Sequence, residues 1–136
     1  MADERAQPEA SGTESAQVKP NGKGALLRVT DPQGFEIRLD LDTWEKHITV
    51  GHPEMKDYLE LLSKTLSEPE VIQRSPLQPE THFYYRLTGR TFHKRNDIYL
   101  SAVVHRSEET KTGFVKTAHL VKKIRKEGET VWLKRN

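Results

Sequence analysis

The first regular pattern of hydrophobic and polar residues in this chain lies between residues 25 and 41. Ala25–Thr30 is a short strand-like run, and Phe35–Leu41 alternates apolar with polar side chains over seven residues. A two-residue period is typical of strands with one buried face. The residues between the two runs read Asp-Pro-Gln-Gly, a composition that favours a tight turn. The pattern therefore predicts a β-hairpin.

After the hairpin the period lengthens to that of a helix. Asp42 and Glu45 have the spacing of a capping box, with Asp42 at the N-cap. Trp44 and Ile48 are four residues apart and would share one helical face. These features predict a short helix over 43–50.

A second helical pattern follows directly. Four apolar residues recur at spacings of four, three and four: Met55, Leu59, Leu62 and Leu66. Pro53 suits the first turn of a helix, and Pro69 suits a position after its end. A helix over 53–66 is therefore expected.

The period returns to that of strands after residue 70. Strand-like segments are expected at 71–74, 82–87, 98–105 and 114–121, and 131–133 could add a terminal strand. Proline, glycine and Asn-Asp mark the joints between them. The order of elements predicts an α+β domain, in which two N-terminal helices pack on a roughly four-stranded antiparallel sheet and a short hairpin precedes them.

The totals set the limits of this architecture. Residues 1–24 are rich in Ala, Glu, Ser, Gly and Pro without aromatic residues, which predicts a disordered tail, and 25–136 suffices for a single domain. No apolar run approaches the ~18 residues that span a bilayer, and the acidic start does not resemble a secretory signal, so a cytoplasmic location and no membrane partner are expected. The chain has no cysteine, which excludes disulfides and thiolate chemistry.

Charge is distributed unevenly along the chain. Residues 1–24 carry a net charge of −1, residues 25–73 a net charge of −5 and residues 74–136 a net charge of +8. A basic C-terminal half suits a polyanionic partner, although lysine and arginine on an exposed sheet face would produce the same totals. Lys122–Lys126 can likewise be a solvated edge or a phosphate contact.

The histidines are the first candidates for chemistry. His47 and His52 are five residues apart across Gly51, which is not the spacing that places two ligands on one helical face, so no metal and no cofactor are expected. The chain also lacks a glycine-rich phosphate loop, a Gly-x-Ser-x-Gly elbow and a His-Glu-x-x-His motif. Histidine with Arg, Lys and Thr suits metal-free RNA cleavage, which needs a base, an acid and charge stabilisation at phosphate.

Strand alternation limits which candidates can meet. Thr117 and His119 should point to one side of their strand and Lys116 to the other. Only one of Tyr85 and Arg86 can share that side unless a bulge intervenes. Structural roles are the alternative: His47 and His52 can cap or pack short helices, Thr117 can serve strand propensity, and His82, His93 and His105 can be surface residues.

Several segments together resemble a known family. They are Trp44-x-x-His47-Ile48, Gly51-His52-Pro53-Glu54, Glu68–Ile72, Tyr84-Tyr85-Arg86 and Gly113–His119. In this order and spacing they are similar to the phage-barnase-EndoU-colicin-RelE-like nucleases, a phage-associated family of metal-independent RNases. The resemblance spans about residues 35–120 and implies a barnase/RelE-like domain.

The resemblance implies a toxin-like, metal-independent endoribonuclease that forms a 2′,3′-cyclic phosphate by 2′-hydroxyl attack. The implied catalytic residues are His47, His52, Arg86 and Thr117. The substrate-binding candidates are Lys116, His119, Tyr85 and Arg74, and His119 stands where the family more often has an aromatic residue. RNA is the expected partner, with an antitoxin or immunity protein as a second one. The alternatives are a non-catalytic RNA- or protein-binding module and a phage-associated structural protein.

Overall fold

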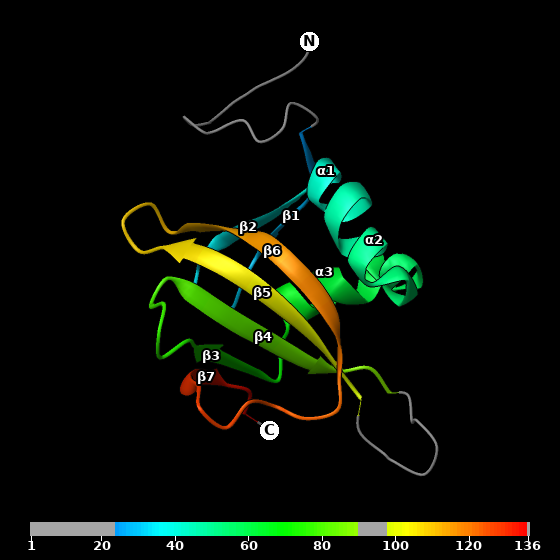
Figure 1. The fold of residues 1–136 in the computed structure, drawn as a ribbon. Helices are drawn as coiled ribbons and strands as arrows, with labels where there is room; N and C mark the ends of the chain where they lie inside the picture. The colour runs from blue at the N-terminus through cyan, green and yellow to red at the C-terminus, as the bar shows by residue number, and fades with distance from the viewer. Residues whose placement is uncertain (1–23, 90–97, 136) are drawn as a thin grey trace.

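The computed structural model describes residues 24–89 and 98–135. The predicted disordered tail over 1–24 thus lies outside the described residues except for Gly24, and so does His93. The strands are β1 (Ala25–Thr30), β2 (Glu36–Asp40), β3 (Val71–Arg74), β4 (Thr81–Leu87), β5 (Tyr99–Ser107), β6 (Thr112–Val121) and β7 (Glu129–Leu133). In the described part of the chain these seven strands form one sheet, in the order β1-β2-β6-β5-β4-β3-β7 (Figure 1).

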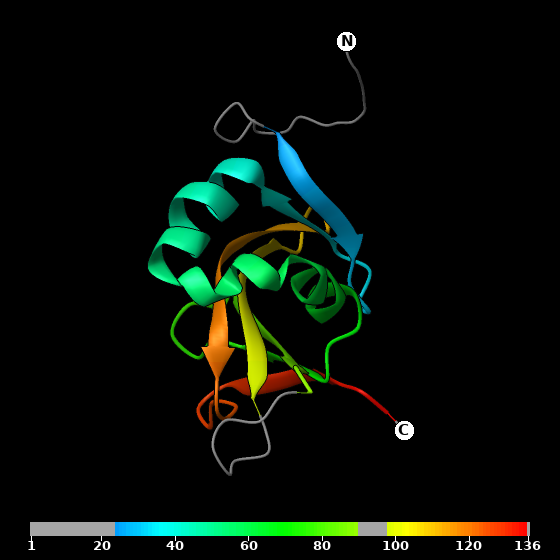
Figure 2. The same ribbon diagram turned by 90° about the vertical axis from the view of Figure 1, so that its right-hand side faces the viewer.

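The helical part lies between β2 and β3. It consists of α1 (Leu41–Thr43), the π-helical η1 (Trp44–Ile48), α2 (Thr49–Gly51), the 3-10 helix η2 (Pro53–Asp57) and α3 (Leu59–Ser67). The first three pieces run on as one helical segment, and all five lie to one side of β5 and β6 (Figure 2). Within the described residues, no helix is both long and apolar enough to cross a membrane.

The predicted fold class is wrong. The structure has a seven-stranded mixed sheet and short helical pieces, not two helices on a four-stranded antiparallel sheet. The hairpin is present, but it belongs to the sheet because β2 pairs in parallel with β6 over Thr112–Phe114. The C-terminal strand β7 pairs with β3 and not with β6, which precedes it in the chain.

Gly113 permits the contact between β2 and β6. A Cβ at this position would lie 2.8 Å from the carbonyl oxygen of His105 and 3.0 Å from Cδ1 of Ile37. Both distances are below ordinary van der Waals contact, and the first atom is backbone that cannot move aside freely. A glycine here therefore lets the hairpin pack against β6.

The helices also differ from the predicted ones. The expected capping box at Asp42 is absent: the N-cap is Asp40, and no side chain donates or accepts a capping hydrogen bond there. The expected helix over 53–66 is interrupted at Tyr58, between η2 and α3. The apolar spacing does not reveal this break, because Met55 and Leu62 reach the same core from both sides of it.

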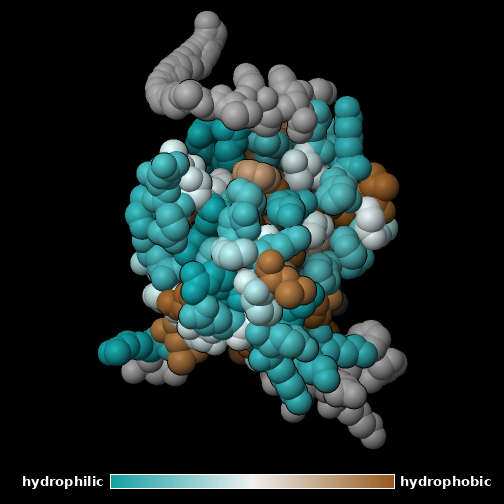
Figure 3. Space-filling view, turned by 60° about the vertical axis from the view of Figure 1, so that its left-hand side comes forward, coloured by the Kyte–Doolittle hydropathy of each residue, from teal (hydrophilic) through white to brown (hydrophobic). Residues whose placement is uncertain are grey.

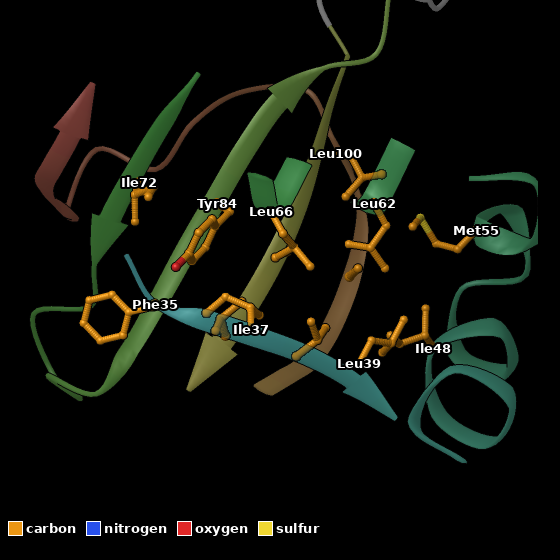
Figure 4. Packing of buried hydrophobic residues seen from close by; sticks show 14 residues of the cluster. Phe35, Ile37, Leu39, Ile48, Met55, Leu62, Leu66, Ile72, Tyr84 and Leu100 are labelled. Atoms are coloured by element: carbon orange, nitrogen blue, oxygen red, sulfur yellow. The ribbon is translucent and has the colours of Figure 1, made fainter. Parts of the chain in front are cut away.

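The main core lies between the helices and one face of the sheet. Figure 4 shows side chains from β2, the helical segments, β3, β4 and β5 meeting there, among them Leu39, Met55, Leu66, Tyr84 and Leu100. Strand β2 contributes alternate side chains to this core: Ile37 and Leu39 are fully buried, while Arg38 between them points away. We call this side of the sheet the helix face.

The opposite face of the sheet, called here the open face, carries a smaller apolar cluster. Its buried members are Val71, Phe83 and Tyr85, and Ile124 packs on them. The segment 122–128 crosses this face on its way from β6 to β7, and the side-chain amide of Gln73 donates a hydrogen bond of 3.0 Å to the carbonyl of Arg125. This segment covers the β3–β4 side of the open face.

A buried polar cluster fastens the hairpin turn to the middle of the sheet. Asp31 accepts hydrogen bonds from the backbone N–H groups of Gln33 and Phe35, both at 2.9 Å, and one from the hydroxyl of Tyr84. Arg106 donates to Asp31 at 3.4 Å and to Gln33 at 2.8 Å, and its guanidinium lies 3.9 Å from the centroid of the Phe35 ring. Burial raises the pKa of Tyr84 far above its usual value, so this hydroxyl is a permanent donor.

His82 is buried, which corrects its expected surface position. Only 3% of it is exposed, and its Nδ1 lies 3.3 Å from the carbonyl oxygen of Glu80. Burial lowers the pKa of His82 from 6.5 to about 4, and the charge of Arg106 acts in the same direction. The native state therefore holds this ring neutral in mildly acidic solution.

This burial predicts acid destabilisation. In the unfolded chain His82 takes up a proton near pH 6.5, whereas the native ring does so only near pH 4. The stability that neutral His82 contributes is therefore complete above pH 6.5 and is lost as the pH falls toward 4. This difference in pKa corresponds to about 3 kcal/mol of unfolding free energy. Urea unfolding between pH 7 and pH 4.5 should show a smaller pH dependence in His82→Gln than in the wild type; equal pH dependence would contradict the assignment.

Candidate functional site

Two histidines meet at the edge between the helical segment and the open face. The rings of His52 and His119 are stacked, with centroids 5.0 Å apart and an interplanar angle of 21°. His52 lies between α2 and η2, and His119 lies on β6. The structure thus brings together two sequence-predicted residues that are 67 positions apart.

The arrangement of β6 explains how they meet. The hairpin pairs with β6 only over Thr112–Phe114, and η1 and η2 contact this strand. Ala118 is fully buried on the helix face, so the neighbouring His119 points to the open face. His52 reaches it from the helical segment at the side of β6.

The environment of His119 favours a neutral ring. Burial lowers the pKa of His119, and the positive charges of His52 and Arg125 act in the same direction, while Glu54 opposes them. Its Nδ1 is buried and has no hydrogen-bond partner among the described residues. A doubly protonated ring would therefore hold a buried, unsatisfied N–H group, which is costly. The ring of His119 is therefore held in its neutral form, which is the form that a general base has before the reaction.

His52 has a different neighbour. Its Nδ1 lies 3.8 Å from a carboxylate oxygen of Glu54, and both side chains are partly exposed. At this distance the two groups can form an ion pair when the imidazole carries a proton, but not a hydrogen bond. His52 is partly exposed and has this carboxylate neighbour, so it is the candidate proton donor of the pair.

Arg125 supplies a fixed positive charge on the same face. Its backbone N–H donates to the hydroxyl of Tyr85 at 3.4 Å, and its carbonyl accepts from Gln73 at 3.0 Å. Its exposed guanidinium lies 4.6 Å from the centroid of the Phe83 ring. The two main-chain hydrogen bonds anchor the backbone of Arg125, and the contact with Phe83 orients its guanidinium, a group that can bind phosphate. Its charge is close enough to act on the pKa of His119.

The register places further side chains beside the pair. Tyr85, Ser101 and His119 face one another across β4, β5 and β6, and Phe83, Val103 and Thr117 form the next row. Thr117 is half-buried and shares the open face with His119, as strand alternation predicts. Tyr85 is 2% exposed, so it supports Arg125 from below and does not line the surface.

Lys116 occupies a bulge in β6. The register shifts so that Val103 faces Thr117 while Val104 faces Val115, which leaves Lys116 without a cross-strand partner. Its side chain is exposed. The prediction from strict alternation of side chains along this strand does not contain this bulge.

Three sequence-predicted residues lie apart from the histidine pair. The imidazole of His47 is exposed on η1, and no hydrogen bond, ion pair or ring contact joins it to another described residue. Arg86 lies on the helix face, because it is paired with the buried Leu100, and donates at 2.5 Å to the carbonyl of Glu68 at the end of α3. Arg74 is paired with Glu129 at 2.6 Å.

Sequence reasoning missed three residues of this site: Glu54, Ser101 and Arg125. Glu54 follows His52 by two positions, and no local spacing shows that its carboxylate lies beside that ring. Arg125 belongs to a basic run whose path across the sheet depends on where β7 pairs. Ser101 is buried and faces His119, and this follows only from the register between β5 and β6.

Comparisons of the chain with protein-family models, with curated proteins and with solved structures found no match. In residues 24–89 and 98–135, no three His, Asp or Glu side chains are grouped as ligands for a metal ion. The site is therefore interpreted from its own geometry: a stacked histidine pair, a carboxylate beside one ring and a fixed guanidinium near the other.

Proposed function

We propose that the protein is a metal-independent endoribonuclease and that His52 and His119 are its acid and base. The observation that carries this proposal is the stacked pair itself, in which one ring is held neutral and the other lies beside a carboxylate. Cleavage of RNA next to a ribose 2′-hydroxyl needs these two proton-transfer groups and a cation for the phosphate. All three are present on one side of β6.

The first half of the reaction uses His119. Its neutral ring removes the proton of the 2′-hydroxyl, and the oxygen attacks the adjacent phosphorus atom. Arg125 and the hydroxyl of Thr117 donate to the non-bridging oxygens, where negative charge increases in the transition state. Thr117 is placed for this because it is two residues from His119 on the same strand face.

The second half uses His52. Its imidazolium donates a proton to the departing 5′-oxygen as the P–O5′ bond breaks, and Glu54 lies 3.8 Å from the ring on the side of Nδ1. The products are a 2′,3′-cyclic phosphate and a 5′-hydroxyl end. One proton has entered His119 and one has left His52, so exchange with water restores the starting state.

Further support comes from the sequence. The net charge of +8 over residues 74–136 suits a polyanionic substrate. The resemblance to phage-associated nucleases supports the same reaction class and a toxin-like role, with an antitoxin or immunity protein as the partner that blocks the site. A cytoplasmic location, where RNA is abundant, completes the proposal.

The direct test is cleavage in the absence of divalent metal. A 5′-labelled single-stranded RNA should be cut in EDTA, while DNA of the same sequence should remain intact because it lacks the attacking hydroxyl. Circular dichroism should verify that the sample is folded. Folded protein that leaves RNA uncut across pH 5–8 would refute the proposal.

A non-catalytic RNA-binding module is the second candidate. It is favoured by the exposed cations of the open-face segment, Lys123, Arg125 and Lys126, which need no histidine to bind phosphate. This alternative predicts binding that weakens steeply with salt and is unchanged in His119→Ala, together with no cleavage.

A further inference from the structure

A row of exposed and half-buried side chains crosses the open face at the other end of β6. Arg28 of β1 faces Arg38 of β2, Arg38 faces Phe114 of β6, and Phe114 faces His105 of β5. Their chain neighbours Ile37 and Val115 are buried on the helix face, so the row points away from it. The row therefore lies on the same face of the sheet as the histidine pair.

The bulge at Lys116 makes this possible. Phe114 and His119 are five positions apart, and regular alternation would place them on opposite faces. Because Lys116 is the extra residue of the bulge, the strand regains its phase and both side chains point to the open face. A bulge that re-aims side chains is typical of strands next to functional sites.

Phe114 is unusual for its place in the sheet. It is 45% exposed although β6 has strand neighbours on both sides at this point. Its ring is stacked on His105, with centroids 5.1 Å apart and an interplanar angle of 22°. In the view of Figure 3 hydrophilic residues cover most of the surface and apolar residues form small separate groups. An accessible aromatic ring such as that of Phe114 can stack on a flat ligand with polar edges.

The neighbouring charges specify the ligand further. Asp40 holds the guanidinium of Arg38 at 3.0 Å, while its Nη1 forms no hydrogen bond with a described residue. Arg28 is more exposed and lies 4.0 Å from Glu36, so its guanidinium is free to move toward a ligand. Lys116 is exposed and forms no ion pair with a described carboxylate. An aromatic ring with three nearby cations suits a nucleobase and its phosphates.

We propose that Phe114 and His105 form a base-stacking subsite for single-stranded RNA, with Arg28, Arg38 and Lys116 contacting the backbone. This rests on the proposed function, since it assigns the substrate of the same site. The strand would run along β6 from the histidine pair to Phe114, a distance of roughly 15 Å at the rise of a β-strand, or a few nucleotides. Duplex RNA does not fit, because its bases are already stacked on both sides.

Binding to a non-cleavable strand tests the subsite separately from cleavage. Fluorescence anisotropy would measure the affinity of full-length protein for a 2′-O-methyl RNA octamer in EDTA. Phe114→Ala and Phe114→Leu should each weaken binding by about tenfold, because stacking needs a π-face, and Phe114→Tyr should retain it. Leu77→Ala is the matched control, since Leu77 is an exposed apolar residue in the β3–β4 connection and should have no effect.

The outcomes separate this subsite from the catalytic proposal. Unchanged affinity in Phe114→Ala, equal losses in Phe114→Ala and Leu77→Ala, or no binding of the octamer by the wild type would overturn the subsite. Preference for blunt duplex RNA would overturn it as well. Binding that depends on Phe114, in a wild type that cuts no RNA in EDTA, would support the subsite and refute the nuclease.

Discussion

Replacing His119 by alanine is expected to lower the rate of RNA cleavage by a factor of about 10² to 10⁴, which is the usual contribution of a general base. The half-buried ring packs on His52, and its loss leaves a position that water can fill. His119→Gln keeps most of the volume and should lose the same activity. Single-turnover cleavage rates and the thermal midpoint, measured on the same samples, would separate lost chemistry from lost folding.

The control for this prediction is His47, which the sequence alone ranks above His119. His47→Ala removes an exposed ring without a contact to the pair, so its cleavage rate should stay near that of the wild type. His52→Ala should resemble His119→Ala, and the double variant should be little worse than either, because the two groups act as one unit. A large loss in His47→Ala with full activity in His119→Ala would contradict the assignment.

The pair also predicts that kcat/KM falls in acidic solution. This acidic limb should reflect protonation of His119, whose pKa is lowered by burial. In His119→Gln the acidic limb should disappear from the residual activity. An unchanged acidic limb would assign it to another group.

Replacing Arg106 by methionine is expected to destabilise the fold by about 3 to 5 kcal/mol, the largest stability effect that the structure predicts. The change leaves the Asp31 carboxylate in a place where its side chain is 0% exposed and without its cation. It also removes the donor to Gln33 and the stacking on Phe35, which hold the hairpin turn. Urea unfolding at pH 7 would measure the loss.

Arg74→Met is the matched control, because Arg74 also has a carboxylate partner but both side chains are exposed. It should cost no more than about 1 kcal/mol. Adding Asp31→Asn to Arg106→Met should recover part of the loss, since it removes the uncompensated charge. Equal costs for Arg106→Met and Arg74→Met would show that burial of the pair does not determine its strength.

The sequence predicts the positions of the strands well. The expected segments 71–74, 82–87, 98–105 and 114–121 correspond to β3, β4, β5 and β6 within a few residues, because their apolar side chains alternate or form short β-branched runs. Their partners were not predictable in the same way. A two-residue period shows which side chains share a face, but it does not show that β2 pairs with β6 or that β7 returns to β3.

The candidate site shows the same division. Local spacing correctly places Thr117 and His119 on one face, while the contact of His52 with His119 depends on how the helical segment crosses β6. Arg86 shows what local spacing cannot predict. Its neighbour Tyr85 points to the open face, so Arg86 points to the helix face and lies at the end of α3. The bulge at Lys116 follows from long-range pairing and has no local signal.

The central claim is that RNA is cut by the stacked histidines without metal. The most direct measurement uses a DNA oligonucleotide with one ribonucleotide, incubated in EDTA with wild type or the His52→Ala, His119→Ala double variant. The account predicts that the wild type cuts only at the ribonucleotide and leaves a 2′,3′-cyclic phosphate, detected by mass, and that the folded double variant leaves the strand intact. Equal cutting by both proteins, or a product without the cyclic phosphate, would contradict it.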